Sequence, residues 1–438
     1  MWSPAISFDK GTLAAGGSSA RQLATDFGTP TFFIDEDHFR ARATAWAKAL
    51  EANFGTSAGN VYYAAKAFIC TDVARWIKEE GIGIDVCTGG ELAVALAGGI
   101  DPKKIEVHGN NKSVAEIDRA VAVGVKTIVM DSLFEIERVA AAATAHGVRQ
   151  AVMLRLTPGV EAHTHESIST AHEDVKFGFS IASGAAAAAV AQVLSHTSLE
   201  LRGFHCHVGS QIFGTESFEL AATRIIALMK QVKEEHRIEL PELDLGGGYA
   251  IAYLPGEVTV EPEDVLPSLS AVVKRECAAA GLALPIISIE PGRNIVGPTT
   301  FTLYEVGTVK EVVLEDGGTR RYISVDGGMS DNIRTSLYDA QYFAVLADRS
   351  SQAPLTLSRV VGKHCETGDI VIRDIELPSD IAPGDLLATP ATGAYGRSMA
   401  SNYNHVPRPP VVAIRDSRAR VIVRRENEAD LLALDVKE

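Results

Sequence analysis

The sequence predicts a mixed fold, a (β/α)8 TIM-type barrel of the α/β class followed by an all-β domain built as a β-sandwich or β-barrel. Between about residues 60 and 290, short β-branched runs alternate with Ala-rich amphipathic stretches, which is typical of repeated βα units around a parallel sheet. After residue 290 the pattern changes to short strands and turns. At 438 residues the chain also exceeds the usual size of a single core.

Each β-branched run predicts one barrel strand. The eight expected strands lie at residues 61–66, 82–86, 104–108, 126–131, 151–156, 201–208, 242–246 and 286–290. Helical segments separate them, including the Ala-rich stretch 184–193, whose high helix propensity favours a helix over a linker. Eight strands with seven intervening helices match a barrel in which functional groups gather at the carboxyl ends of the strands.

The second domain is predicted from shorter strands bounded by turns. These are expected at residues 301–313, 321–328, 357–365, 369–377, 385–395 and 419–425. The first thirty or so residues have no barrel partner, so we expect them to pack with this domain. The predicted domains are therefore 36–290 for the barrel, and 1–35 together with 291–438 for the β domain.

Charge and hydrophobic pattern exclude several classes of protein. The 41 basic and 56 acidic residues give a net charge of -15 without long runs of one sign, which argues against a nucleic-acid or anionic-membrane surface. No signal-peptide pattern and no bilayer-length apolar stretch is visible, so a cytoplasmic location is expected. The five cysteines lack CxxC spacing and suggest neither a zinc site nor a disulfide framework.

Polar and glycine residues follow nearly every predicted barrel strand. In chain order they are Lys66, Asp85, His108, Asp131, Arg155, His205, His207, Gly246 to Gly248, Glu290 and Arg293. Helix caps and turns explain some of them, but their number predicts an active-site face. Lys66 leaves an apolar strand, where poor solvation promotes loss of its proton and attack on an aldehyde. Taken alone, Lys66 could also simply extend its amine to water.

The glycines after the last two strands predict a phosphate site. Turns without side chains, GGG at 246–248 and the Pro-Gly pair before Arg293, let backbone N–H groups converge on an anion. Glu290 beside them suits a protonated ring nitrogen, with an ion pair to Arg293 as the alternative. A Schiff-base lysine, an anion cradle and such an acid together describe pyridoxal 5'-phosphate. His207 is placed to stack on its ring, and Ser210 to reach its phosphate.

The pair His205 and His207 also supports a rival interpretation, a metal-dependent barrel hydrolase. Histidines two residues apart on a strand point to the same side, as metal ligands must. The first strand offers no histidine, and a metal site would leave the glycine turns unexplained. No metal is therefore expected.

Seven motifs, taken together, resemble the diaminopimelate decarboxylases, a family of alanine-racemase-like, fold type III pyridoxal-phosphate decarboxylases. They are YYAAKA, GIDVCTGGEL, FHCHVGSQ, LDLGGGY, EPGR, CETGD and GAYGRSMASNYN, and the resemblance runs from about residue 28 to residue 425. It implies pyridoxal 5'-phosphate as cofactor and a homodimer with shared active sites. The β domain would then contribute substrate and dimer contacts.

The resemblance implies roles in cofactor binding. Lys66 would hold the cofactor covalently, His207 would stack on its ring, and Glu290 would pair with the ring nitrogen. The other implied cofactor-binding residues are Ser210, Gly247, Gly248, Gly292, Arg293 and Tyr395.

The resemblance also implies a substrate site. Arg334 and Tyr338 would bind the far carboxylate, and Glu366, as a buried acid, the far ammonium. Arg293 and Tyr395 would lie at the boundary between substrate and cofactor. Cys365, in the polar segment HCETGD, would be catalytic by helping to protonate the carbanion from the partner subunit.

The implied reaction is decarboxylation of meso-2,6-diaminopimelate at its D centre to L-lysine and CO2, the last step of lysine biosynthesis. An ornithine, arginine or carboxynorspermidine decarboxylase is the nearest alternative, but those substrates lack the second amino-acid head group. A non-catalytic pyridoxal-phosphate carrier would leave the β domain without a purpose. Whether Asp85, Arg155 and His108 contact the cofactor stays open, and Gly396 and Arg397 depart from the family pattern, which puts the packing of their loop in question.

Overall fold

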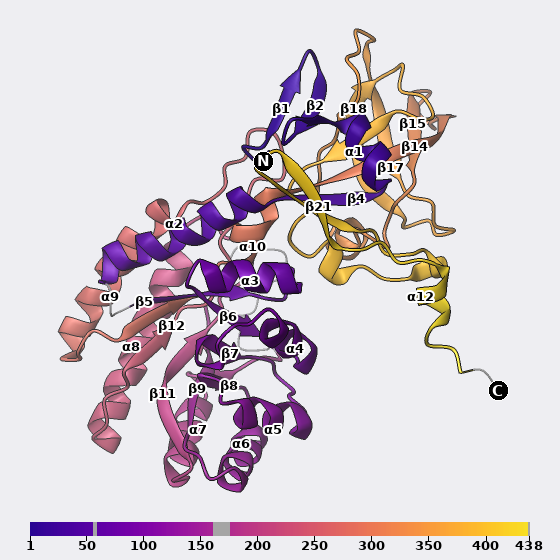
Figure 1. The fold of residues 1–438 in the computed structure, drawn as a ribbon. Helices are drawn as coiled ribbons and strands as arrows, with labels where there is room; N and C mark the ends of the chain where they lie inside the picture. Colours follow the sequence, from indigo (N-terminus) through magenta and orange to yellow (C-terminus); the bar gives the residue numbers. More distant parts are fainter. Residues whose placement is uncertain (56–58, 161–175, 437–438) are drawn as a thin grey trace. The chain divides into compact units, whose positions relative to one another are not determined.

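The computed structural model describes residues 1–55, 59–160 and 176–436. Packing divides the chain into two compact units (Figure 1). One comprises residues 42–250 and 260–294, and the other residues 1–41, 251–259 and 295–438. The domain bounds 36–290 and 291–438 expected from the sequence stay a prediction.

The first unit is a closed eight-stranded parallel barrel, which confirms the predicted fold. Its strands are β5 (Gly59–Ala64), β6 (Gly83–Val86), β7 (Ile105–Val107), β8 (Thr127–Met130), β9 (Gln150–Thr157), β11 (Leu199–Cys206), β12 (Glu242–Asp244) and β13 (Ile286–Ile289). Each pairs in parallel with its neighbours, β13 with β5 and β8 with β9, so the sheet closes on itself. The two-residue strand β10 (Phe179–Ser180) pairs in parallel with the last two residues of β9.

Seven helices connect the barrel strands, as the sequence predicts for the described residues. They are α3 (Thr71–Glu79), α4 (Gly89–Ala97), α5 (Val114–Val123), α6 (Leu133–Ala145), α7 (Ala185–Ser195), α8 (Glu216–His236) and α9 (Pro262–Ala280). Helix α7 confirms the helix expected in the Ala-rich stretch. At the start of α5, Ser113 and Glu116 form a capping box that satisfies free backbone N–H groups. The long helix α2 (Glu36–Phe54) precedes β5, and the short α10 (Gly292–Val296) follows β13.

The second unit is built on a mixed β-sheet. Its strands are β4 (Thr31–Asp35), β14 (Thr300–Val313), β15 (Thr319–Val325), β16 (Val345–Leu346), β17 (Leu355–Val361), β18 (Ile370–Pro378), β19 (Leu386–Thr389), β20 (Val411–Arg415) and β21 (Arg418–Val423). Most neighbours are antiparallel, but β15 with β17 and β4 with β20 run parallel. The strand expected at 385–395 ends at Thr389, while β4 and β20 were not predicted.

Short elements complete this unit. They are the hairpin-like sheet β1 (Ile6–Asp9), β2 (Thr12–Ala15) and β3 (Ser18–Ser19), with helices α1 (Ala20–Phe27), α11 (Arg334–Tyr338) and α12 (Glu428–Leu432). The N-terminal strand β4 pairs with β14, so the first residues join the β-sheet as expected. Phe33 of β4 stacks on Phe301 of β14, with ring centroids 5.1 Å apart, inside one of the two apolar cores of the unit. None of the helices described is long and apolar enough to cross a membrane.

Asn294 joins several segments of the barrel unit. Its side-chain oxygen accepts hydrogen bonds from Trp46 Nε1 at 2.8 Å and from Arg42 Nη2 at 2.5 Å. Its amide nitrogen donates to the carbonyls of Ala250 and Val260, at 3.0 and 2.8 Å. The residue is 1% exposed, so each of these polar groups depends on the others for its hydrogen bonds.

Replacing Asn294 with alanine is expected to lower the free energy of unfolding by about 3 kcal/mol, because it leaves buried donors and acceptors unpaired. Chemical denaturation followed by tryptophan fluorescence measures this loss. The same change at the exposed Asn111 is the control and should alter stability by less than about 0.5 kcal/mol. Equal effects at both positions would contradict the role given to Asn294.

Candidate active site

Lys66 lies at the carboxyl end of the first barrel strand. Strand β5 ends at Ala64, so the lysine belongs to the following turn and not to the strand end itself. Its side chain is exposed, and its charge acts on Asp85, Glu91 and His207. The amine is therefore accessible at the face where catalytic groups of such barrels gather.

Glu290 follows β13 and is 6% exposed. Its Oε1 atom lies 3.2 Å from Nε2 of His108 and 3.2 Å from Nε2 of His205. Burial alone would raise the pKa of the carboxyl, but the charge of His108 and the contact with His205 outweigh burial and hold the pKa well below its usual value. Glu290 is thus an ionised carboxylate inside the barrel. The ion pair with Arg293 was the alternative expected from the sequence, but the carboxylate lies against the two histidines.

The two histidines around Glu290 differ in charge. Burial lowers the pKa of His205 to about 4, so this imidazole is neutral at pH 7. Burial also disfavours the charged form of His108, but Glu290, Glu106 and Asp85 outweigh it and raise its pKa. A metal ligand must be a neutral imidazole, and the raised pKa of His108 disfavours that form. The cluster of His108, His205 and Glu290 therefore favours an ion pair over a metal site.

His207 faces a different environment from His205. Its Nδ1 accepts a hydrogen bond from the backbone N–H of Gly247 at 3.4 Å. Burial lowers its pKa well below the usual value, and the charges of Lys66 and Arg155 lower it further. The two histidines of the HxH motif thus have separate partners, which is evidence against the rival metal pair. A neutral, oriented imidazole suits stacking on an aromatic ring.

The predicted phosphate region consists of turns packed closely against one another. A Cβ atom at Gly247 would lie 2.2 Å from the carbonyl oxygen of Glu290, and one at Gly248 would lie 2.4 Å from that of Gly209. A Cβ at Gly292 would meet Ala64 at 2.6 Å. These glycines are required because backbone segments after four barrel strands approach too closely for any side chain.

Arg293 and Ser210 meet beside these turns. Arg293 Nη2 donates a hydrogen bond to Ser210 Oγ at 2.8 Å, and the arginine is 9% exposed. They bring a buried cation and a hydroxyl to the loops after β13 and β11. This pair supplies the charge and the donors that a phosphate needs.

The described residues fit pyridoxal 5'-phosphate. Oε1 of Glu290 is buried and accepts no hydrogen bond from them, so a protonated ring nitrogen would supply a donor that the carboxylate lacks. The accessible amine of Lys66, the neutral ring of His207 and the Arg293–Ser210 pair match the cofactor's aldehyde, ring and phosphate.

Two of the remaining strand-end residues, Arg155 and Asp131, contact each other, whereas Asp85 is buried near Glu290. Asp85 is 2% exposed, and burial together with the nearby Glu290 raises its pKa well above the usual value. Arg155 Nε lies 3.9 Å from Asp131 Oδ1, and its guanidinium lies over the ring of Phe177 at 4.4 Å. These contacts brace the inside of the barrel.

The substrate residues expected from the sequence belong to the β-sheet unit. Arg334 begins α11, is 7% exposed, and lies over the rings of Tyr253 and Tyr342 at 4.8 and 5.5 Å. Its Nη1 also donates to the hydroxyl of Tyr342, and none of the described carboxylates forms an ion pair with it. The two tyrosines were missed, because no local spacing links them to Arg334. Tyr338 ends the same helix and is half-buried.

Tyr395 has a backbone φ of 61°, a strained value for a residue with a side chain. Such strain concentrates at functional sites. Next to it, a Cβ at Gly396 would lie 2.6 Å from the carbonyl oxygen of Thr392, and Arg397 Nε donates to the carbonyl of Pro409 at 3.2 Å. Gly396 and Arg397, which depart from the family pattern, therefore both have a role in the packing of their own loop.

Cys365 and Glu366 lie on an exposed loop. The expectation of a buried acid at Glu366 is wrong for the single chain, because its side chain is exposed and Tyr403 reaches it only at 3.5 Å. Cys365 is the one exposed cysteine among the five. Sequence reasoning missed His364, which bonds to Ser330 at 2.8 Å and anchors the start of this loop.

The buried, neutral His205 predicts that the free energy of unfolding falls as the pH is lowered. Its folded pKa, about 4, lies below the unfolded value of about 6.5. The unfolded chain therefore binds the extra proton first, and stability is lost as the pH falls from 6.5 towards 4. Between pH 7 and pH 5 the wild type should lose roughly 2 kcal/mol more than His205→Asn. Denaturant titrations of the wild type and the variant at both pH values measure the difference, and equal losses in the two proteins would contradict the assignment.

Comparison with known proteins agrees with this geometry. The family model described as "Pyridoxal-dependent decarboxylase, pyridoxal binding domain" matches residues 36–297. A diaminopimelate decarboxylase from Mycobacterium tuberculosis is 54% identical over 431 residues, which cover 98% of this chain and 95% of the relative. One from Staphylococcus aureus is 42% identical over 427 residues, which cover 98% of both chains.

Solved structures show the same relationship. The diaminopimelate decarboxylase from M. jannaschii in co-complex with L-lysine has a TM-score of 0.91 at 29% identity, covering 100% of this chain and 99% of that one. A lysine/ornithine decarboxylase from Vibrio vulnificus, at 23% identity and a TM-score of 0.74, shares the fold alone. The chain therefore belongs to the diaminopimelate decarboxylase family of pyridoxal-dependent decarboxylases, and its cofactor is pyridoxal 5'-phosphate.

Proposed function

We propose that this protein removes the carboxylate at the D centre of meso-2,6-diaminopimelate to give L-lysine and CO2, the last step of lysine biosynthesis. The observation that carries the proposal is Arg334, a buried cation held by tyrosines without a carboxylate of its own among the described residues. A buried charge of this kind needs an anionic partner. The far carboxylate of the substrate supplies one. Relatives with this named activity at 42–54% identity support the same conclusion.

The barrel residues are proposed to hold and orient the reacting groups. When bound, pyridoxal 5'-phosphate accepts the electron pair left by the departing CO2. Lys66 would bind it covalently through its amine, and Glu290 would keep a proton on its ring nitrogen. His207 would pack on the ring. Ser210, Gly247, Gly248, Gly292 and Arg293 would hold the phosphate, and Tyr395 would close the site.

The substrate residues are proposed to fix the orientation of the bond that breaks. Arg334 and Tyr338 bind the far carboxylate, and Glu366 the far ammonium. Arg293 and Tyr395 also contact the substrate. Binding energy at the distant end would then orient the bond to the D carboxylate, so that the electron pair left on the carbon when CO2 departs can pass to the bound cofactor.

A homodimer with shared active sites is part of the proposal. Cys365 and Glu366 are exposed in the single chain, whereas closing an active site to water prevents stray proton transfer to a reactive carbanion. A second copy of the chain would cover them and place Cys365 where its thiol donates a proton to the carbon that lost CO2. The cytoplasmic location stays a prediction.

Discrimination between substrates tests the function. The wild type should turn over meso-diaminopimelate and leave ornithine nearly untouched, because ornithine would bury Arg334 without an anion. Arg334→Met is expected to lower kcat/KM for diaminopimelate about 100-fold, the worth of a charge-assisted contact.

The control is Arg359→Met, since Arg359 also lies over a tyrosine ring, Tyr322, but pairs with Asp374 on the surface of the same unit. It should keep wild-type kinetics. A wild-type enzyme that prefers ornithine, or an Arg334 variant with unchanged kcat/KM, would count against the proposed substrate.

Mixing two inactive variants tests the shared site. Lys66→Ala and Cys365→Ala should each be nearly inactive as homodimers. After unfolding, mixing and refolding in equal amounts, half of the dimers carry both substitutions on different chains, and one of their two sites is intact. Activity should therefore recover to about a quarter of wild type. No recovery, with mixed dimers confirmed by mass spectrometry, would show that each site draws both residues from one chain.

A further inference from the structure

A row of alternating charges runs through the interior of the barrel. It begins at the carboxylate of Glu290, passes through His108 and Glu106, and ends at the amine of Lys126. Barrels of this kind usually fill the interior with layers of branched apolar side chains. Charged groups there are costly unless each one is compensated. The row therefore needs an explanation beyond packing.

The two middle members of the row lie in strand β7 and directly after it. Glu106 and His108 are two residues apart, so both side chains point to the inside of the barrel. Glu106 is completely buried, and its Oε2 lies 3.9 Å from Nε2 of His108, while Glu290 lies 3.2 Å from the same nitrogen. His108 thus sits between two carboxylates, and only one of them faces the cofactor.

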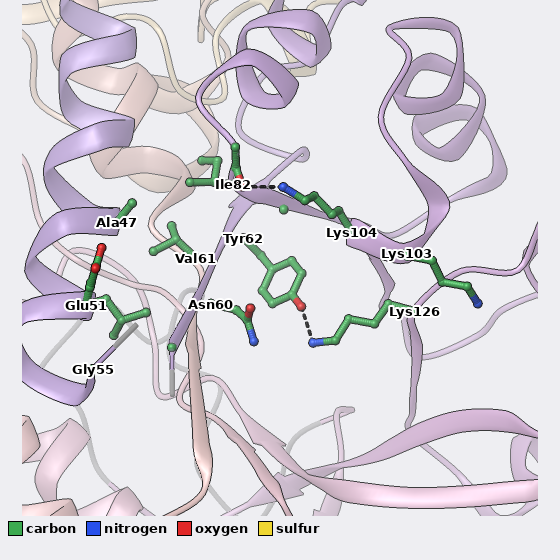
Figure 2. Close-up of a pocket in the computed structure, with 14 residues that line it drawn as sticks. Ala47, Glu51, Gly55, Asn60, Val61, Tyr62, Ile82, Lys103, Lys104 and Lys126 are labelled. Carbon is green, nitrogen blue, oxygen red and sulfur yellow. Dashed lines mark hydrogen bonds between the residues drawn. The ribbon is translucent and has the colours of Figure 1, made fainter. Parts of the chain in front are cut away.

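Lys126 occupies the opposite end of the barrel, just before β8. Figure 2 shows its amine directed at the hydroxyl of Tyr62 beside a cavity of about 370 Å³ at the amino-terminal ends of the strands. Its Nζ lies 3.4 Å from Oε1 of Glu106 and 3.2 Å from Oε2 of Glu242. The side chain of Lys126 is 24% exposed, so the row meets solvent there.

Each charge in the row stabilises the next. Burial raises the pKa of Glu106, but the contact with His108 and the charge of Lys126 outweigh burial and lower it. Glu106 therefore stays ionised and favours the protonated form of His108, which in turn favours the ionised form of Glu290. Lys126 supplies the counter-charge that allows a second buried carboxylate to exist at all.

We propose that Glu106 and His108 are positioning residues for the decarboxylation: they hold Glu290 as an oriented carboxylate under the cofactor ring, with Lys126 as the counter-charge at the far end of the barrel. This inference rests on the proposed function, in which Glu290 keeps the ring nitrogen protonated. Neither residue touches the substrate. Their effect passes through Glu290 alone.

The charged and titratable groups around His108 set the expected direction. They comprise Asp85 of β6, Glu91 of α4, Glu106 of β7, His205 of β11 and Glu290 after β13, and Asp244 of β12 lies close to Glu106 and Glu290. His205 is neutral near pH 7, because burial lowers its pKa to about 4. His108 therefore gains its proton affinity from the carboxylates around it, Glu290 and Glu106 first and Asp85 after them, and its charge is lost as the pH rises through its raised pKa.

The test compares two isosteric substitutions in the holoenzyme. Glu106→Gln removes the negative charge beside His108, so the imidazole should lose its proton about one pH unit lower than in the wild type. Nitrogen NMR of histidine-labelled protein reads this titration directly. The alkaline limb of the kcat profile and the pH dependence of the cofactor absorbance should move by the same amount and in the same direction.

Glu242→Gln is the matched control. Glu242 is also buried and also contacts Lys126, but no contact joins it to His108 in the described structure. Its variant should keep the wild-type titration of His108 and the wild-type kcat profile. If both glutamine variants shift His108 equally, or neither does, the proposed row is wrong.

A second variant, His108→Gln, keeps the inference testable if Glu106→Gln fails to fold. His108→Gln should show, at every pH, the lower kcat that the wild type reaches only above the pKa of His108, and its alkaline limb should vanish. An unchanged limb would overturn the inference. Failure of the proposed function has a different signature: the wild type would not decarboxylate diaminopimelate, while His108 would still respond to Glu106→Gln in the NMR titration.

Discussion

The ionised carboxylate of Glu290, buried at the end of β13, is the constraint on which the barrel interior depends. A carboxylate in such surroundings keeps its charge only if positive or donor groups face it. Two imidazoles lie at 3.2 Å from it: His108, whose pKa is raised by the surrounding carboxylates, and His205, which burial keeps neutral. The polar residues of β7, β11 and β12 then follow from this one charge, because every group that compensates it needs compensation in turn.

The backbone at and after Glu290 fixes the shape of the surrounding loops. The carbonyl of Glu290 lies so close to Gly247 that no side chain fits there, and Gly292 is held against Ala64 in the same way. Contacts between backbones cannot relax by changing a rotamer, so the turns after β5, β12 and β13 keep one arrangement. A site made of such turns is preorganised for its ligand, which lowers the entropic cost of binding.

Local pattern predicted the barrel well, because eight β-branched runs and the helices between them are signals within the sequence. Strand β4 was missed, since its partners β14 and β20 lie hundreds of residues away. Lys66, Glu290 and the glycines were predicted because parallel strands place their ends on one face. Glu106 was not predicted as a site residue, because a lone glutamate in a strand resembles a solvent-facing residue. Only the closed barrel shows that its side chain lies on the inner face. The exposure of Glu366 depends in the same way on tertiary structure.

Chemistry and recognition use different physical means in this protein. In the proposed function, Lys66, His207 and Glu290 of the barrel unit would surround a cofactor shared by many decarboxylases, so these residues would not distinguish one amino acid from another. Arg334 belongs to the other compact unit, and its cation is buried among tyrosines. A ligand without a far carboxylate would leave that cation desolvated and unpaired, which costs more than a missing contact at the surface. Selectivity therefore follows from the penalty for the wrong substrate more than from attraction to the right one.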